Sequence, residues 1–253
     1  MHDDLDGVPL VGGNMDPVVR IGDTVRRTKG PWTESVHSLL GTYAEAGLTE
    51  TPRALGIDAR GREILTFLPG EPLSESAPEV LWAPSTLTAA AGLLRRLHDA
   101  SAPLVGEPGI WRMEDHPPTE VICHNDFAPY NLIASDGRLV GVIDFDMASP
   151  GSRLWDLAYL AYRIVPLAED ARGFDDVRFG ARDDRLRTLV DSYGLDASPD
   201  AVVDAAGRRL DALAAFTERR AEVTGRSDFV EHAAMYRRDA ERLRSGNVTR
   251  PGM

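Results

Sequence analysis

Cysteine and long apolar segments are scarce in this sequence, and each scarcity excludes a class of protein. The chain has one cysteine, Cys123, so it cannot form an intrachain disulfide, and we interpret this thiol as a small buried side chain. No apolar run approaches the roughly 20 residues that a membrane helix needs. The first six residues include three aspartates and no lysine or arginine, whereas a signal peptide begins basic and then becomes apolar. We therefore expect a cytoplasmic protein with no membrane partner.

Basic residues are also too few to favour nucleic acid as a partner. The formal net charge is −12, and binding of nucleic-acid phosphates needs a concentrated basic surface. Only one lysine, Lys29, accompanies 27 arginines. The sequence gives no indication of an obligate protein partner.

What the chain does contain is enough apolar material for one sizeable core or two small ones, since 43% of its 253 residues are hydrophobic. Short apolar runs separated by turn residues predict five strands in the first part, and periodic patterns predict helices in the rest. The expected strands are 8–11, 18–21, 24–27, 54–57 and 63–67, and the expected helices are 33–46, 86–100, 183–194, 199–223 and 228–244.

The most informative segment runs from Val121 to Asp146. It contains Asp126, then Asn131 five residues later, then Asp144, each beside a short apolar run that predicts a buried strand. In the kinase pattern His-x-Asp-x-x-x-x-Asn, the Asp accepts the proton of the attacking hydroxyl, the Asn binds Mg²⁺, and a later Asp provides the second metal ligand. Either Asp126 or Asn131 alone would be an ordinary turn residue. Together, these residues predict a phosphoryl-transfer site.

The residue types suit this chemistry. Phosphoryl transfer passes through a loose transition state, so the protein mainly positions the reactants and supplies positive charge to the phosphate oxygens. Mg²⁺ prefers a few oxygen ligands, which the amide of Asn131 and the carboxylate of Asp144 provide. Asp126 then stays free to orient and deprotonate an acceptor hydroxyl.

The segment from His124 to Asn131 resembles the His-Gly-Asp-x-x-x-x-Asn motif of the aminoglycoside phosphotransferase family, bacterial small-molecule kinases that share the protein-kinase fold. The resemblance extends over about residues 8 to 165. Its further matches are Phe67-Leu68-Pro69-Gly70, Leu94-Arg95-Arg96-Leu97-His98, Ile143-Asp144-Phe145-Asp146 and Trp155-Asp156-Leu157-Ala158.

The resemblance implies an α+β, two-lobe protein-kinase-like fold. Residues 1–69 would form a small β-rich N-lobe, with a five-strand sheet and one helix, as a lid over the nucleotide. Residues 70–253 would form a larger, mainly helical C-lobe, with a substrate-binding region from about 166. The implied reaction transfers a phosphoryl group from ATP or GTP to a hydroxyl of a small molecule, with Mg²⁺ as cofactor.

The resemblance also implies roles for individual residues. His124 would brace the catalytic loop, and Asp156 would accept hydrogen bonds from the loop backbone. Phe67 and Leu68 would form the hinge beside the nucleotide. Gly12 and Gly13 would let backbone N–H groups approach the phosphates, although a plain turn explains two glycines equally well.

The sequence departs from the family pattern in the N-lobe. The family places Lys, or sometimes Arg, on the third strand to hold the α and β phosphates, and pairs it with a helix Glu. We place Arg26 at the strand position and His37 at the helix position, with Glu34 one turn earlier. Arginine can hold phosphate in a bidentate manner, so the exchange is chemically workable.

Three functional alternatives follow. The favoured one is an ATP- or GTP-dependent phosphotransferase acting on an antibiotic, sugar or other metabolite. A kinase of Ser or Thr in a peptide precursor would use the same apparatus, and a nucleotide-binding pseudokinase would fit the missing Lys and Glu. A polycationic acceptor is not expected, because residues 166–253 carry 17 acidic and 15 basic residues, a surplus of only two carboxylates.

Overall fold

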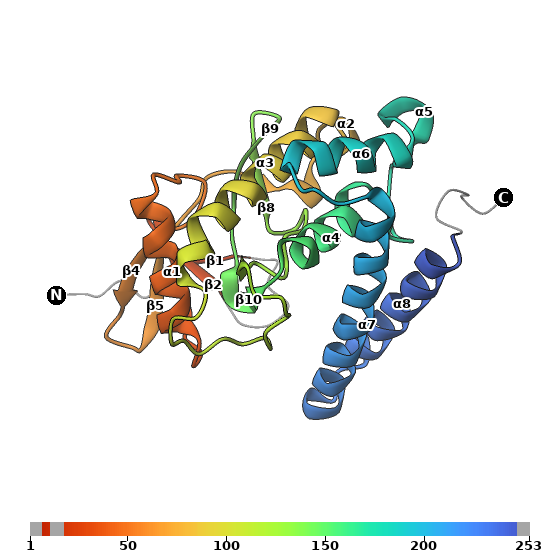
Figure 1. Ribbon diagram of the computed structural model, residues 1–253. Coiled ribbons are helices and arrows are strands. Elements are labelled where there is room, and N and C mark those ends of the chain that lie inside the picture. Colours follow the sequence, from red (N-terminus) through yellow and green to blue (C-terminus); the bar gives the residue numbers. More distant parts are fainter. Residues whose placement is uncertain (1–6, 11–17, 247–253) are drawn as a thin grey trace.

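The computed structural model describes residues 7–10 and 18–246 and confirms the α+β class. Figure 1 shows a β-rich part, which contains the N-terminal strands and α1, on one side, and the long C-terminal helices on the other. Gly12 and Gly13 lie outside the described residues. No helix in the described ranges has the length and apolar character needed to cross a membrane.

The N-terminal part is a five-stranded antiparallel sheet in the order β1-β2-β3-β5-β4. The turn at Gly22-Asp23 joins β2 to β3, as its sequence predicts. The cross-strand register places Arg27 directly opposite Glu63. The elements are β1 (Val8–Leu10), β2 (Val18–Ile21), β3 (Thr24–Thr28), α1 (Thr33–Glu45), β4 (Ala54–Ile57) and β5 (Arg62–Thr66), which confirms the expected strands and helix within one to two residues.

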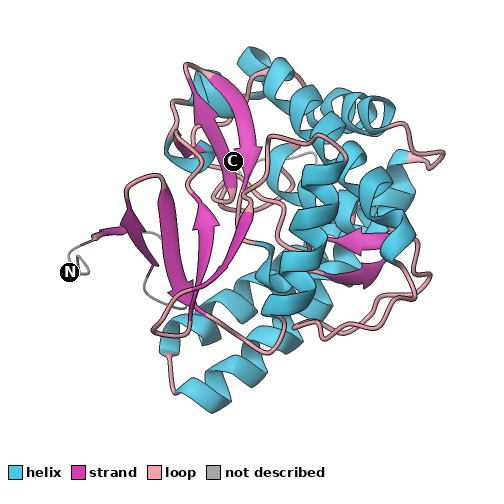
Figure 2. Cartoon of the chain, turned by 90° about the vertical axis from the view of Figure 1, so that its left-hand side faces the viewer, coloured by secondary structure: helices cyan, strands magenta, loops and turns pink. Residues whose placement is uncertain are grey.

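The remainder contains two small sheets and the helices. Strands β6 (Glu71–Pro72), β8 (Leu132–Ser135) and β9 (Arg138–Val142) form one sheet, and β7 (Val121–Cys123) pairs with β10 (Ser149–Gly151) in the other. Figure 2 shows these sheets beside the helices. The α-helices are α2 (Pro78–Leu81), α3 (Pro84–Ser101), α4 (Arg153–Ile164), α5 (Asp176–Phe179), α6 (Arg182–Tyr193), α7 (Pro199–Thr224) and α8 (Ser227–Arg244), and short 3-10 turns lie at Leu73–Glu75, Ala102–Leu104 and Phe145–Met147.

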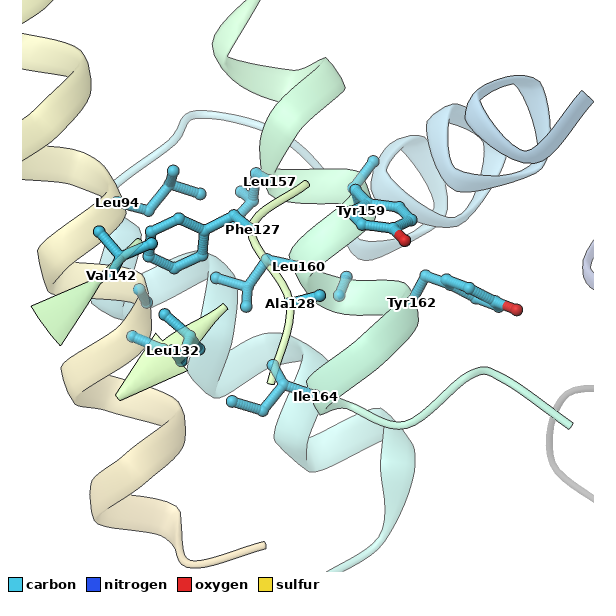
Figure 3. Close-up of a cluster of buried hydrophobic side chains, with 14 of the residues drawn as sticks. Leu94, Phe127, Ala128, Leu132, Val142, Leu157, Tyr159, Leu160, Tyr162 and Ile164 are labelled. Carbon is cyan, nitrogen blue, oxygen red and sulfur yellow. The ribbon is translucent and has the colours of Figure 1, made fainter. Parts of the chain in front are cut away.

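The hydrophobic core extends under the segment 124–131. Phe127 and Ala128 are fully buried among side chains of α3, β8, β9 and α4 (Figure 3). Burying a Phe side chain contributes roughly 1.5–3 kcal/mol. The loop is therefore anchored by its apolar residues, and its polar residues are held at the edge of this core.

The connection between the two parts is held close to the second sheet by Gly70. Its φ is 135°, and a Cβ there would lie 2.4 Å from the carbonyl oxygen of Ala134 in β8. Only glycine meets both conditions without strain. The division into residues 1–69 and 70–253 stays a prediction, and this connection is the segment on which it depends.

Candidate active site

The catalytic-loop candidate Asp126 lies between β7 and β8, and both of its carboxylate oxygens have partners. The Tyr130 hydroxyl donates to Oδ1, and the Asn131 amide donates to Oδ2 at 2.9 Å. Burial raises the pKa of Asp126 above its ordinary value, and the hydrogen bond from Tyr130 opposes that rise. The carboxylate is thus oriented by its neighbours and less acidic than a free aspartate.

Asp156, on α4, holds this loop from beneath. Its two oxygens accept the backbone N–H groups of His124 at 2.7 Å and Asn125 at 2.9 Å. His98 on α3 lies 3.0 Å away and is itself bonded to the Tyr193 hydroxyl. Burial alone would raise the pKa of Asp156, but the hydrogen bond and charge of His98 outweigh it and lower that pKa. These are the contacts that the predicted bracing role requires.

His98, Cys123 and Asp156 form the group of potential metal ligands that the described residues bring together. His98 and Asp156 are already bonded to each other, and Asp156 also holds the loop backbone. Cys123 is buried, as expected, and burial raises its pKa. We therefore interpret this group as the structural brace of the loop.

His124 connects the catalytic loop to the strand that precedes Asp144. Its Nε2 lies 3.0 Å from the carbonyl oxygen of Ile143, and its Nδ1 accepts the backbone N–H of Asp126 at 3.2 Å. These partners require the tautomer that carries its proton on Nε2. The ring therefore fixes Asp126 relative to Asp144, and is not placed for proton transfer.

Asn125 occupies the motif position where the family has glycine. Its φ is 62°, a left-handed conformation that Asn tolerates better than most residues. Its side-chain amide donates to the Met147 carbonyl and to the Ser149 hydroxyl, and accepts from the Trp155 indole. Asn125 therefore keeps the backbone shape and adds three side-chain hydrogen bonds.

The predicted metal ligands offer the oxygen atoms that Mg²⁺ prefers. Asp144 follows β9 with φ 64°, and 47% of its side chain is exposed. Both hydrogen bonds of the Asn131 side chain use its nitrogen, so its amide oxygen is available. One carboxylate and one amide oxygen fit a hard divalent cation.

Arg27, and not Arg26, is the strand arginine that faces Asp144. Its guanidinium lies 3.0 Å from Asp144 and 2.7 Å from Asp146, and also pairs with Glu63. Successive side chains of a strand point to opposite faces. Arg26 accordingly turns the other way, where it donates to the Thr24 hydroxyl at 2.6 Å. The alternating pattern alone fits either register, and these contacts favour Arg27, whereas the role of Arg26 in nucleotide binding stays a prediction.

The acidic partner of Arg27 comes from a strand. Glu63 on β5 is buried between Arg27 and His37, whose Nε2 lies 3.0 Å from the second carboxylate oxygen. His37 therefore lies on helix α1, at the position where we placed it, but it contacts Glu63, which in turn pairs with Arg27. Sequence reasoning missed Glu63 because its partners are far apart along the chain.

The hinge residues Phe67 and Leu68 lie where β5 leaves the N-terminal sheet. The Phe67 backbone N–H donates to the Asp23 carbonyl, and its ring lies under the Arg20 guanidinium at 3.7 Å. Leu68 is half-buried beside Gly141 of β9. Their contact with a nucleotide stays a prediction.

Arg209 on α7 is a loop-positioning residue that the sequence did not reveal. Its side chain is 1% exposed, and one guanidinium nitrogen donates to the backbone carbonyl of Asn125. The guanidinium lies 5.3 Å from the Trp155 ring and 5.1 Å from the Tyr159 ring. The residues around Arg209 in the sequence do not distinguish it from the other 26 arginines, because its partner Asn125 is 84 residues away.

Comparison with known proteins decides the family. Residues 108–189 match the model of a phosphotransferase enzyme family. The chain is also 34% identical over 201 residues to the trifolitoxin immunity protein of Rhizobium leguminosarum bv. trifolii, covering 75% of each chain. The chain belongs to the phosphotransferase enzyme family. The matched residues include Asp126, Asn131, Asp144 and Asp156 but not the N-terminal sheet.

Solved structures show the same kinase-like fold as this phosphotransferase. Ethanolamine kinase from Plasmodium vivax has a TM-score of 0.67 at 12% identity, covering 93% of this chain and 82% of its own. A choline/ethanolamine kinase family protein from Mesorhizobium loti has a TM-score of 0.61 at 20% identity, covering 92% and 86%. Macrolide 2'-phosphotransferase from Brachybacterium faecium has a TM-score of 0.56 at 15% identity, covering 87% of each chain.

Proposed function

We propose that this phosphotransferase moves the terminal phosphoryl group of ATP or GTP to a hydroxyl of a small molecule, with Mg²⁺ as cofactor, in the cytoplasm. One observation carries the proposal: Asp126 lies on a loop that buried hydrogen bonds hold in place, beside the oxygen donors of Asn131 and Asp144. A nucleotide-binding pseudokinase would not need an oriented, half-buried base.

In this proposal the protein's own residues divide the work. Asp126 orients the acceptor hydroxyl and takes its proton as the new O–P bond forms and the bond to the nucleoside diphosphate breaks. Asn131 and Asp144 would hold Mg²⁺, which supplies positive charge to the phosphate oxygens. Arg27, which pairs with Asp144 and Asp146, would turn to the phosphates of a bound nucleotide.

The proposal is tested first by ligand binding. Mg²⁺ together with ATP or GTP should raise the melting temperature of the wild type and leave Asp144→Ala unchanged, because Asp144 would be the charged metal ligand. Equal shifts in the two proteins would refute the metal assignment. Asp136→Ala, in the exposed β8–β9 turn, is a matched control that should behave as the wild type.

The second test is turnover with acceptors. Release of nucleoside diphosphate should be measured with aminoglycoside, macrolide, nucleoside and simple sugar acceptors. Stimulated release together with a phosphorylated product identifies the acceptor class. Nucleotide binding without release, for every acceptor, would favour the pseudokinase.

A Ser or Thr hydroxyl in a toxin is a second candidate acceptor, since one relative is named as a trifolitoxin immunity protein. The catalytic residues do not distinguish a sugar hydroxyl from that of Ser or Thr. If the chain confers immunity by phosphorylation, it should add a phosphoryl group to a Ser or Thr hydroxyl of the toxin. Mass spectrometry of toxin treated with wild type or with Asp126→Asn would decide this, because only the wild type should modify it.

A further inference from the structure

The hydroxyl that contacts the proposed base belongs to the protein itself. The Tyr130 O–H donates to Oδ1 of Asp126, and its oxygen lies 2.9 Å from the Tyr159 hydroxyl. The other carboxylate oxygen of Asp126 is occupied by the Asn131 amide. Tyr130 therefore has the relation to Asp126 that the mechanism requires of an acceptor hydroxyl.

We propose that Tyr130 is a self-phosphorylation site, used when no external acceptor is bound. The proposal rests on the proposed phosphotransferase function. The Tyr130 side chain is 38% exposed as a whole, and its hydroxyl lies between Asp126 and the Tyr159 hydroxyl. Because Tyr130 lies four residues after Asp126 on the braced loop, the reaction would be intramolecular.

The step is chemically complete with ATP as the phosphoryl donor. The Tyr130 oxygen forms a bond to the terminal phosphorus of ATP while the bond between that phosphorus and the bridging oxygen of ADP breaks. The phenolic proton passes to Asp126. The products are phosphotyrosine at position 130, ADP and a protonated Asp126, which returns its proton to solvent.

The surroundings favour Tyr130 over its neighbours. Tyr159 is 2% exposed, and its hydroxyl contacts Tyr130 and not Asp126. A pocket of about 440 Å³, lined by Pro129, which is adjacent to Tyr130, and by Arg163, would accommodate a phosphoryl group. Arg163 pairs with Asp170 at 3.1 Å, but its Nε has no hydrogen-bond partner among the described residues. That guanidinium would offset part of the added charge.

The modification would inhibit the enzyme. A phosphate on Tyr130 would add up to two negative charges next to Asp126 and would occupy the position of the acceptor hydroxyl. A small-molecule acceptor bound in the cleft would displace the phenol and protect it. Self-phosphorylation would therefore lower activity when acceptor is absent and nucleotide is abundant.

The test uses purified full-length protein incubated with Mg²⁺ and ATP without an acceptor, followed by intact-mass measurement and peptide mapping. The wild type should gain one phosphoryl group at Tyr130, with a first-order rate that does not depend on protein concentration. Asp126→Asn should slow the reaction about 10²–10⁴-fold. Tyr130→Phe should remain unmodified, whereas Tyr159→Phe should still be phosphorylated at Tyr130.

Several results would overturn the proposal. Binding of Mg²⁺-ATP, seen as a rise in melting temperature, without modification of Tyr130 would refute it and leave the phosphotransferase function standing. Modification at a residue other than Tyr130 would also refute the proposal and leave the phosphotransferase function standing. Faster acceptor-free ATP hydrolysis in Tyr130→Phe, with no phosphotyrosine in the wild type, would show that the phenol only excludes water. Absence of both binding and modification would overturn the phosphotransferase function as well.

Discussion

The proposed catalytic loop, residues 124–131, and the proposed phosphate clamp, Arg27 with its carboxylate partners, are built in opposite ways. The loop is held by buried, directed hydrogen bonds. Asp156, which is fully buried, accepts hydrogen bonds from two backbone N–H groups and contacts the His98 ring. The clamp is a group of charged side chains in which Arg27 has three carboxylate partners, and two of these, Asp144 and Asp146, belong to the opposite part of the chain. The first arrangement fixes a geometry, and the second can exchange partners.

This difference matches what each part must do. A base must be held to a fraction of an ångström relative to its substrate, which suits backbone amides bound by a buried carboxylate. A phosphate clamp would have to release its carboxylates when a nucleotide binds, which suits ion pairs with partly exposed carboxylates such as Asp144 and Asp146. Glu63 stays buried on the N-terminal side and would keep Arg27 oriented in both states.

The largest effect should come from the base itself. Asp126→Asn should lower the rate of phosphoryl transfer by about 10²–10⁴-fold, because a general base contributes that much. Nucleotide affinity, measured by calorimetry with Mg²⁺, should be nearly unchanged, since Asp126 faces the acceptor. If the variant lost nucleotide affinity together with activity, Asp126 would contribute to nucleotide binding, and the contrast between the two regions would not hold.

The next effect is on the brace. Asp156→Asn replaces an oxygen that accepts hydrogen bonds with an NH₂ group that faces a backbone donor. Each buried donor left unsatisfied costs about 1–3 kcal/mol, so the free energy of unfolding should fall by at least that amount. Urea unfolding of the purified proteins measures it, and Asp136→Asn, in an exposed turn, is the control.

The same variant has a signature in pH. The pKa of Asp156 is lower in the folded chain than its ordinary value of 3.8. Its contribution to stability is therefore complete above that value and is lost as the pH falls through the lower folded pKa. The wild type should lose stability more steeply than Asp156→Asn below about pH 4. If the curves of unfolding free energy against pH ran parallel for the two proteins, the pKa of Asp156 would not be lowered in the folded chain.

The contrast also explains how much the sequence could predict. Asp126, Asn131 and Asp144 are found together in one segment because the loop and its flanking strands are contiguous. The strands and main helices follow from apolar patterns, whereas the two-lobe fold was expected from the family resemblance. The brace was predicted only through the family resemblance, since Asp156 lies 30 residues after Asp126. Glu63 and Arg209 were missed, because a cross-strand register and the packing of α7 decide their partners.

The third effect separates the two strand arginines. Arg27→Met should weaken Mg²⁺-nucleotide binding by about 1.5–3 kcal/mol, the range for hydrogen bonds to charged groups. Arg26→Met, on the opposite face of β3, is the matched control, and this variant should bind Mg²⁺-nucleotide as tightly as the wild type. Calorimetry decides the question. The reverse result would restore Arg26 as the clamp and require a different strand register once nucleotide is bound.

The smallest effect should come from His37, which reaches the clamp only through Glu63. His37→Ala removes one hydrogen bond to that carboxylate, and a single hydrogen bond contributes about 0.5–1.5 kcal/mol. Nucleotide affinity should therefore fall less than in Arg27→Met, and His37→Gln, whose amide can donate to Glu63, should recover part of the loss. If His37→Ala weakened binding as much as Arg27→Met, the effect would be too large for a contact made only through Glu63. His37 would then act directly in nucleotide binding.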